Sequence, residues 1–312
     1  MKAKRIAAID IGTVTCRLLV ADVDDQGLHQ LYRSSAIVNL GEGVDANGYL
    51  LDAAMQRVDA QIAEYMQVIE ELTTDETPVQ IVAMATSASR DASNAADFVA
   101  MLERRGVRLS VIPGEKEAAL SFLGAGSNFK GENLLVCDVG GGSSELIAGV
   151  GGQEPIHKFS FNVGCRRVTE RFLKSDPPTT DEMQEAIDWF APQFATFFDE
   201  LRERDFQVGR IVAVAGTATS LVSIEQAMEV YDSSRVHGAH VSLASLDQMR
   251  DRLASLPLDQ RRQVTGLQPD RAPVIVAGTL ILGEIVRQAA TSGFTVSEAD
   301  ILHGIIMDAA SA

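Results

Sequence analysis

The sequence contains two copies of one short pattern, in which an acidic residue is followed two positions later by glycine. Residues 8–15 read AIDIGTVT and residues 136–143 read VCDVGGGS, and apolar β-forming residues flank both. The acidic residues of the two copies are Asp10 and Asp138, which lie 128 positions apart. Such a pattern is typical of a strand, a tight turn and a returning strand. Because internal repetition reflects architecture, the pattern predicts two related lobes, each presenting an Asp-x-Gly hairpin to one ligand held between them.

The segments after each hairpin alternate between apolar strands and amphipathic helices. Helical periodicity is present in residues 51–72 and 181–202, and short apolar runs at 79–85 and 211–215 predict buried strands. The stretch 230–271 is the most irregular. Strands that alternate with helices indicate an α/β fold in which each lobe is built on a mixed sheet.

Length and composition are those of a soluble globular protein with room for two domains. The chain has 312 residues, of which 46% are hydrophobic and 22% charged. No apolar run approaches the roughly 18 residues of a membrane span. The basic start of the sequence is followed too early by Asp10 to predict a signal peptide.

Charge and cysteine usage narrow the possible partners. Three cysteines without metal-type spacing (Cys16, Cys137 and Cys165) predict reduced thiols in a cytoplasmic protein. The formal charge of −16 argues against a protein that binds nucleic acid through a broad basic surface. It does not exclude an anionic substrate, because glycine amides, a few arginines and a cation can hold phosphate locally.

The chemistry of the hairpins points to such a phosphate site. Glycine lets the backbone approach a phosphate and offer N–H donors, and an Asp carboxylate can hold a divalent cation beside it. The second copy, with three glycines and then Ser143, is the stronger anion-binding candidate. Asp and Gly are also common in plain turns, which is the simpler interpretation of one hairpin. Two matching copies favour a shared phosphate site.

The paired hairpins resemble those of the actin-like ATPase superfamily, and further segments are similar to the exopolyphosphatase/guanosine pentaphosphate phosphatase family. The resemblance implies two actin-like (ribonuclease H-like) lobes with mixed sheets and an interdomain cleft, and a homodimer of the short form without an extra C-terminal domain. The first lobe would comprise residues 1–125 plus 298–312 and the second 126–297. The matching segments, in family order, are residues 85–94, 112–118, 138–145, 216–219, 236–238 and 271–278.

Glu117 is the catalytic candidate that the resemblance implies, as the carboxylate that orients and deprotonates the attacking water. Hydrolysis of a phosphoanhydride needs such a carboxylate together with neutralised phosphate charge. From the residues alone, Glu115 and Glu117 fit at least as well as ordinary acidic residues at a helix N-terminus. The resemblance decides for catalysis.

The resemblance also implies a set of ligands for metal and phosphate. The divalent cation would be Mg²⁺, or another such as Mn²⁺. Arginines suit phosphate because they bind it bidentately. The implied metal ligands are Asp10, Asp138 and Glu145. The implied phosphate ligands are Gly12, Thr13, Arg17, Arg90, Gly140, Gly141, Gly142, Ser143 and Arg271.

Three departures from the family pattern affect the expected substrate preference. Val14 replaces an asparagine of the first turn, Lys116 stands where an acidic residue is common, and Leu302-His303 replace Arg-Glu. Val14 cannot supply the amide contacts of asparagine. Lys116 would repel a metal or attract phosphate.

The leading functional hypothesis is a phosphoanhydride hydrolase that releases terminal orthophosphate from inorganic polyphosphate, guanosine pentaphosphate, or both. An ATP-dependent kinase or ATPase of the same fold is the first alternative, since a fold does not determine function. The second is a catalytically weak protein that binds polyphosphate or an alarmone. Phosphate release without an ATP-dependent product separates the first hypothesis from both alternatives.

Overall fold

The computed structural model describes residues 4–311 and divides into two compact units. The first unit contains the chain up to residue 124 together with the segment from residue 301, and the second contains residues 125–300. Each unit is an α/β unit built on one mixed sheet.

The sheet of the first unit has five strands in the order β3-β2-β1-β4-β5. β1 pairs antiparallel with β2 and parallel with β4, and β4 pairs parallel with β5. The three parallel strands therefore end at the same edge of the sheet. The strands are β1 (Lys4–Ile11), β2 (Thr15–Asp24), β3 (Gly27–Ile37), β4 (Val79–Ala85) and β5 (Leu109–Val111).

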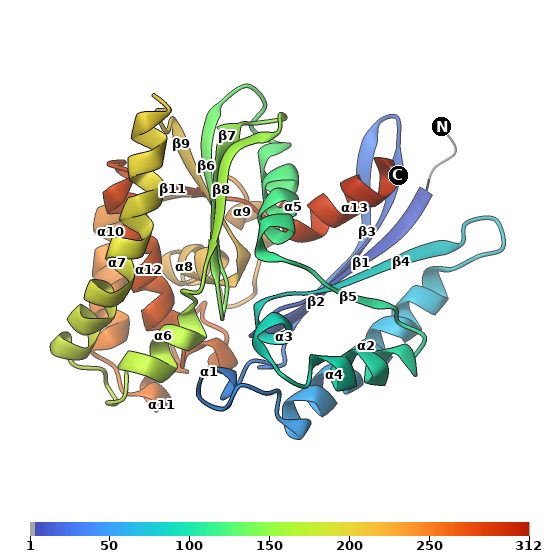
Figure 1. The fold of residues 1–312 in the computed structure, drawn as a ribbon, viewed down its shortest axis with the longest axis horizontal. Helices are drawn as coiled ribbons and strands as arrows, with labels where there is room; N and C mark the ends of the chain where they lie inside the picture. The colour runs from blue at the N-terminus through green and yellow to red at the C-terminus, as the bar shows by residue number, and fades with distance from the viewer. Residues whose placement is uncertain (1–3, 312) are drawn as a thin grey trace. The chain divides into compact units, whose positions relative to one another are not determined.

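Helices cover both faces of this sheet because β1 and β2 are apolar on both faces. On one face, residues such as Ile9 and Leu18 pack in one cluster with α2 and α4. On the other face, Ile6 and Leu19 pack against α5 and α13. Figure 1 shows α2 and α4 along one side of these strands. The helices are α1 (Val44–Asn47), α2 (Asp52–Leu72), α3 (Ser87–Asp91), α4 (Ala95–Glu103), α5 (Gly114–Gly126) and α13 (Ile301–Ser311).

The sheet of the second unit has six strands in the order β10-β11-β9-β6-β7-β8. β6 pairs antiparallel with β7 and parallel with β9, as β1 pairs with β2 and β4 in the first unit. The repeated sequence therefore forms a repeated topology. The strands are β6 (Asn133–Val139), β7 (Ser144–Val150), β8 (Pro155–Phe161), β9 (Arg210–Val214), β10 (His240–Ser242) and β11 (Gly293–Val296).

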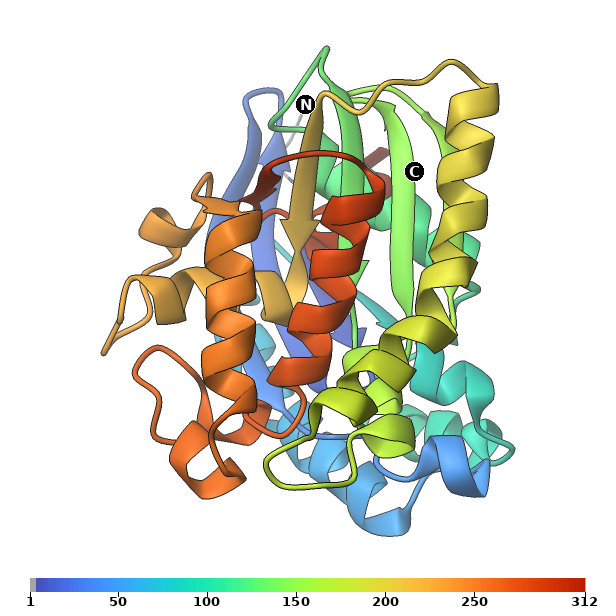
Figure 2. The ribbon, with the colours of Figure 1, turned by 90° about the vertical axis from the view of Figure 1, so that its left-hand side faces the viewer.

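A layer of helices packs on this second sheet, and Figure 2 shows α7, α10 and α12 in front of its strands. The buried rings of Phe190, Phe194 and Phe197 on α7 face the sheet, where Phe161 of β8 meets Phe194 edge to face. No helix among residues 4–311 has both the length and the apolar character to cross a bilayer. The helices are α6 (Cys165–Phe172), α7 (Thr180–Glu203), α8 (Ala215–Glu225), α9 (Ser233–Val236), α10 (Leu243–Ala254), α11 (Leu258–Arg261), the 3-10 helix η1 (Pro269–Arg271) and α12 (Ile275–Gln288).

The long elements follow the expected periodicity, but the irregular stretch does not. The helices predicted at 51–72 and 181–202 are confirmed as α2 and α7. The prediction of irregular structure for 230–271 is wrong in part, because this stretch contains α9, β10, α10, α11 and η1. These elements, apart from α10, have only three or four residues, so they are too short to show a period.

Gly304 provides a test of the packing in the first unit. A Cβ at this position would fall on the backbone carbonyl of Leu120 in α5. We expect Gly304→Ala to lower the free energy of unfolding by about 1–3 kcal/mol through overpacking. Gly283→Ala on α12 is the matched control, because its new Cβ meets the flexible end of Arg287 (3.0 Å) and lies at an ordinary van der Waals distance from Leu246 (3.7 Å). Thermal denaturation should show Gly283→Ala as neutral or stabilising; equal losses in the two variants would contradict the packing argument.

Candidate functional site

In the first unit, three predicted segments converge at the edge where the parallel strands end. The N–H of Thr86, after β4, donates to the carbonyl of Ile11 at the end of β1 (3.2 Å). The N–H of Ile112, after β5, donates to the carbonyl of Ala85 (3.0 Å). Loops at the carboxyl ends of parallel strands are the usual place for a ligand in an open α/β sheet. The hairpin turn after β1 therefore lies beside the segments that carry Arg90 and Glu117.

The backbone of the first hairpin turn is anchored on one side. The turn closes with a hydrogen bond from the N–H of Gly12 to the carbonyl of Thr15 (2.9 Å). The carbonyls of Thr13 and Val14 accept hydrogen bonds from N–H groups of the segment 38–41. In a planar trans peptide the C=O of one residue and the N–H of the next point in opposite directions. The N–H groups of Val14 and Thr15 therefore point away from segment 38–41.

The side chains of this first turn do not all face a ligand. Val14 is buried, and its replacement of asparagine removes a side-chain donor but leaves the backbone N–H. Thr13 is buried against Gly41, where a Cβ would overlap the Thr13 methyl group. The contribution of this turn to anion binding is therefore mainly that of its backbone.

Asp10 and Arg17 form an ion pair across the first hairpin. They are direct cross-strand partners, and the Arg17 Nε and Nη2 atoms lie 3.0 and 2.6 Å from the same Asp10 oxygen, Oδ2. Both side chains are largely buried. A metal ion at Asp10 would compete with this arginine for Oδ2, and a phosphate at Arg17 would compete with the aspartate.

Arg90 and Glu117 are brought together although they lie 27 positions apart. Nη1 of Arg90 is 2.6 Å from Oε2 of Glu117 and also donates to the carbonyl of Ile112 (3.1 Å). Glu117 is in the first turn of α5, and its side chain is about 10% exposed. An arginine at this distance fixes the carboxylate in place and stabilises its negative charge.

Lys116, the neighbour of Glu117, is engaged elsewhere in the first unit. Its Nζ lies 2.8 Å from Oδ2 of Asp308 on α13, and both side chains are more than 40% exposed. The charge of Lys116 is therefore offset by a surface ion pair, which is of the kind that contributes little to stability.

The second hairpin turn repeats the geometry of the first. The N–H of Gly140 donates to the carbonyl of Ser143 (3.0 Å), as Gly12 does in the first turn. The carbonyls of Gly140 and Gly141 accept hydrogen bonds from the N–H groups of Cys165 and Arg166, both at 2.9 Å. The first turn of α6 thus holds the glycine turn from behind. Gly164, which precedes α6, has no room for a Cβ because it lies on the carbonyl of Gly141.

A side chain completes this anchoring. Nε of Arg167 donates to the carbonyl of Gly142 (2.9 Å). All three glycine carbonyls are therefore directed toward α6. By the peptide geometry described above, the N–H groups of Gly141, Gly142 and Ser143 face the opposite side. Successive N–H groups on one side of a turn form a concave site for an anion.

Asp138 and Glu145 are the equivalents of Asp10 and Arg17, but both are acidic. They are direct cross-strand partners, so their side chains lie on the same face of the hairpin, and both are buried. Oε1 of Glu145 accepts a hydrogen bond from the hydroxyl of Ser160 (2.7 Å). Adjacent like charges are destabilising across strands. A divalent cation would offset that repulsion, and one or two carboxylates are the usual protein ligands of Mg²⁺.

The donor set for a metal is therefore better in the second unit than in the first. Among residues 4–311, no group of three or more His, Cys, Asp and Glu side chains is arranged to hold a metal ion. The residues present fit a magnesium ion held by Asp138 and Glu145 with water or phosphate oxygens as its other ligands.

Arg271 lies against the start of α8 and close to Cys165, at the start of α6. Its guanidinium rests against Gly216, at the start of α8, where a Cβ would overlap it. Burial raises the pKa of the Cys165 thiol, while the positive charges of Arg271 and Arg166 act in the opposite direction. Both arginines are therefore near Cys165, whose N–H binds the carbonyl of Gly140.

The structure thus places the predicted residues in two groups and adds residues that were not predicted. Arg167 holds the second turn through the carbonyl of Gly142, and Gly164 lets the start of α6 approach Gly141 because it has no Cβ. Their sequence signal was weak, consisting of a glycine at the expected start of a helix. The first-unit group is Asp10, Gly12, Thr13, Arg17, Arg90 and Glu117. The second-unit group is Asp138, Gly140, Gly141, Gly142, Ser143, Glu145 and Arg271.

Comparison of the sequence with protein families and with known proteins identifies one family. The model of the Ppx/GppA phosphatase family matches residues 19–312. The chain is 36% identical to Exopolyphosphatase 2 of Mycobacterium tuberculosis over 99% of this chain and 100% of that protein.

Solved structures agree with this assignment. An exopolyphosphatase-like protein superposes with a TM-score of 0.86 at 32% identity, over 99% of this chain and 98% of the other. The Aquifex aeolicus member of the Ppx/GppA family superposes with a TM-score of 0.78 at 28% identity, over the same shares of the two chains. The chain belongs to the Ppx/GppA phosphatase family and has the fold of its solved members.

Proposed function

We propose that this protein is an exopolyphosphatase that hydrolyses the terminal phosphoanhydride bond of inorganic polyphosphate and releases orthophosphate. The observation that carries the proposal is the position of Glu117, held by Arg90 at the sheet edge where the first glycine turn lies. A fixed carboxylate beside an anion-binding turn is the arrangement that water attack on a phosphate requires.

The two turns supply phosphate binding in this proposal. The carbonyls of the two turns are hydrogen-bonded to segment 38–41 and to α6, so the N–H groups on the opposite side of each turn are oriented before a ligand binds. Preoriented donors need no reorganisation when negative charge develops on a phosphoryl group, which makes them more effective than mobile ones.

Glu117 accepts a proton from the attacking water in the proposed reaction. The water oxygen bonds to the terminal phosphorus, the bridging P–O bond breaks, and the shortened chain leaves as an oxyanion. The hydrogen bond from Arg90 fixes the orientation of the Glu117 carboxylate. The guanidinium of Arg90 would also neutralise negative charge on a phosphate bound beside it. Hydrolysis needs no acceptor hydroxyl, which distinguishes it from the action of a kinase.

Asp138 and Glu145 would hold the divalent cation, for which Mg²⁺ is the first choice. Such an ion neutralises charge on phosphate oxygens. Asp10 would contribute less to metal binding, because its Oδ2 already accepts a hydrogen bond from Arg17. Its main role in this proposal is to orient the Arg17 guanidinium.

Polyphosphate is the first choice of substrate because the relative that matches over its whole length is named for it. Guanosine pentaphosphate remains the second candidate, since its terminal phosphoanhydride is chemically equivalent. A phosphate-release assay with polyphosphates of several lengths, guanosine pentaphosphate and ATP tests the proposal; release from none of them would refute it.

The role of Glu117 is tested by Glu117→Gln, which keeps the size of the side chain but removes the base. We expect phosphate release to fall by about 10²–10⁴-fold, with the Kd for polyphosphate little changed. The matched control is Glu115→Gln, because Glu115 is an exposed carboxylate in the same helical turn. Equal rates for the Glu117→Gln variant and the wild type would remove Glu117 from the mechanism.

The anchoring of the second turn is tested by Gly164→Ala. The added methyl group pushes on Gly141 and turns its peptide, so we expect weaker anion binding. Losing one hydrogen bond to a charged group costs about 1.5–3 kcal/mol, which corresponds to roughly a 10- to 100-fold rise in Kd. Calorimetric titration with polyphosphate measures it. Gly151→Ala is the control, because its Cβ would also meet a backbone carbonyl, that of Phe129, away from the turn.

The metal assignment is tested with Asp138→Asn and Glu145→Gln. Each substitution removes one negative charge from the carboxylate pair, so the magnesium concentration for half-maximal phosphate release should rise about tenfold or more, as for a loss of about 1.4 kcal/mol. Glu154→Gln, at an exposed position after β7, is the control. An unchanged magnesium dependence in both test variants would show that these carboxylates are not the ligands.

A further inference from the structure

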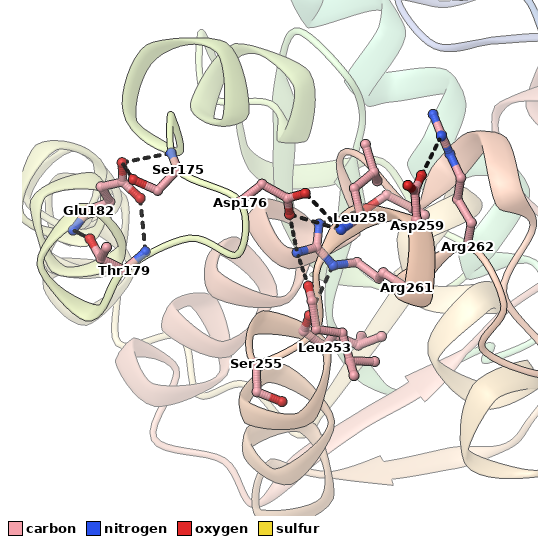
Figure 3. Close-up of polar contacts among 12 residues, drawn as sticks. Ser175, Asp176, Thr179, Glu182, Leu253, Ser255, Leu258, Asp259, Arg261 and Arg262 are labelled. Carbon is pink, nitrogen blue, oxygen red and sulfur yellow. Dashed lines mark hydrogen bonds and ion pairs between the residues drawn. The ribbon is translucent and has the colours of Figure 1, made fainter.

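Arg261 is a buried arginine in the second unit, ten positions before the predicted site residue Arg271. Its guanidinium donates to the carbonyls of Leu253 (2.9 Å), Leu256 (2.8 Å) and Ala272 (3.3 Å). Figure 3 shows the guanidinium of Arg261 beside Leu253, with the carboxylate of Asp176 nearby. Nη2 of Arg261 and Oδ1 of Asp176 are 3.8 Å apart.

The three carbonyls belong to two different segments of the chain. Two lie at the end of α10, and the third is that of Ala272, the residue directly after Arg271. Asp176 adds a third segment, because its carboxylate accepts the N–H of Leu258 at the start of α11 (2.8 and 3.0 Å). The planar fork of one arginine thus fixes η1 relative to α10 and α11.

The environment of Arg261 is an unfavourable place for a charge. Burial lowers the pKa of its guanidinium, and the carboxylate of Asp176 acts in the opposite direction. A lysine could reach some of the same carbonyls, but its three donors radiate from one nitrogen and do not match a planar array. The geometry of the clamp therefore depends on arginine.

The position of Arg271 leaves little freedom for movement of η1. Its guanidinium lies against the backbone of Gly216, where even a methyl group would overlap it. The N–H of Arg271 is also held by the carbonyl of Gln268 (2.9 Å). A displacement of the η1 backbone moves this guanidinium away from the contact.

We propose that Arg261 is a positioning residue for Arg271: its hydrogen bond to the carbonyl of Ala272 holds the Arg271 guanidinium against Gly216, at the start of α8. The inference rests on the proposed function in that Arg271 is taken as a ligand of the substrate's phosphate. Arg261 itself touches no substrate in this scheme and acts through the backbone.

A double-mutant cycle tests the coupling. Arg261→Gln and Arg271→Gln should each lower kcat/KM for polyphosphate. The expected loss is on the order of 100-fold, the effect of displacing a phosphate-binding group such as the Arg271 guanidinium by about 1 Å. The kcat/KM of the double variant should be no lower than that of Arg271→Gln alone, because Arg261 acts only through the position of Arg271. Losses that multiply in the double variant would overturn the proposal, since they would show independent roles.

Arg5→Gln provides the matched control for general loss of structure. Arg5 in the first unit is a similar clamp, with two hydrogen bonds to Asp22 and one to the carbonyl of Leu72. We expect Arg5→Gln to lower Tm. In the double variant with Arg271→Gln, the fold-losses in kcat/KM of the two single variants should multiply, as they do for independent positions. Where Arg261→Gln does not fold, Arg261→Lys replaces it in the cycle, because it keeps the charge but lacks the fork.

A crystal structure of the Arg261 variant tests the proposal without any activity. The Arg271 guanidinium should be displaced from Gly216; an unchanged contact overturns the inference. A wild-type protein that releases no phosphate would refute the proposed function, but the displacement of Arg271 would still decide the positioning role.

Discussion

The candidate site depends on hydrogen bonds made by the backs of the two hairpin turns. A glycine-rich turn is flexible by itself, and its N–H groups bind an anion well only when their direction is fixed. In the first unit the segment 38–41 fixes the turn carbonyls, and in the second unit the start of α6 and Arg167 do so. Both supporting segments follow the third strand of their unit, β3 and β8. The N–H of Gly41 binds the carbonyl of Thr13 as the N–H of Arg166 binds that of Gly141, so the repeat extends from the turns to the segments that support them.

The two copies differ in charge at one cross-strand position. Arg17 lies opposite Asp10 in the first hairpin and forms an ion pair with it, whereas two acidic residues, Glu145 and Asp138, lie opposite each other in the second. A neutral pair can orient an arginine for phosphate, and a buried acidic pair favours a cation. In the proposed mechanism, divergence at this one position assigns phosphate contact to the first hairpin and metal binding to the second, although the backbones are alike.

The sequence predicted the helices that show helical periodicity over many residues and the strands that consist of apolar runs. α2 and α7 have helical periodicity over more than twenty residues, whereas the edge strand β3 is mostly exposed or half-buried and offers no apolar run. The candidate residues came from the hairpins and the family resemblance. The contact of Arg90 with Glu117 could not be predicted, because it arises from the parallel order of β1, β4 and β5. Arg167 and Arg261 gave little signal because they bind backbone carbonyls, and Gly164 because it only permits a close approach of the backbone.

The proposed function requires a chain of net charge −16 to hold a polyanion, and the arginine contacts offer a physical basis for this. Its 43 acidic residues outnumber its 27 basic ones, so attraction would have to come from a few groups at fixed positions. Arg90 is tied to a carboxylate and a carbonyl, Arg167 to a glycine carbonyl, and Arg271 lies against Gly216. Each tie restricts the side chain before the ligand binds, which lowers the entropy lost on binding. If the proposed function holds, local rigidity replaces net charge as the source of affinity and favours recognition of a phosphate at a defined position.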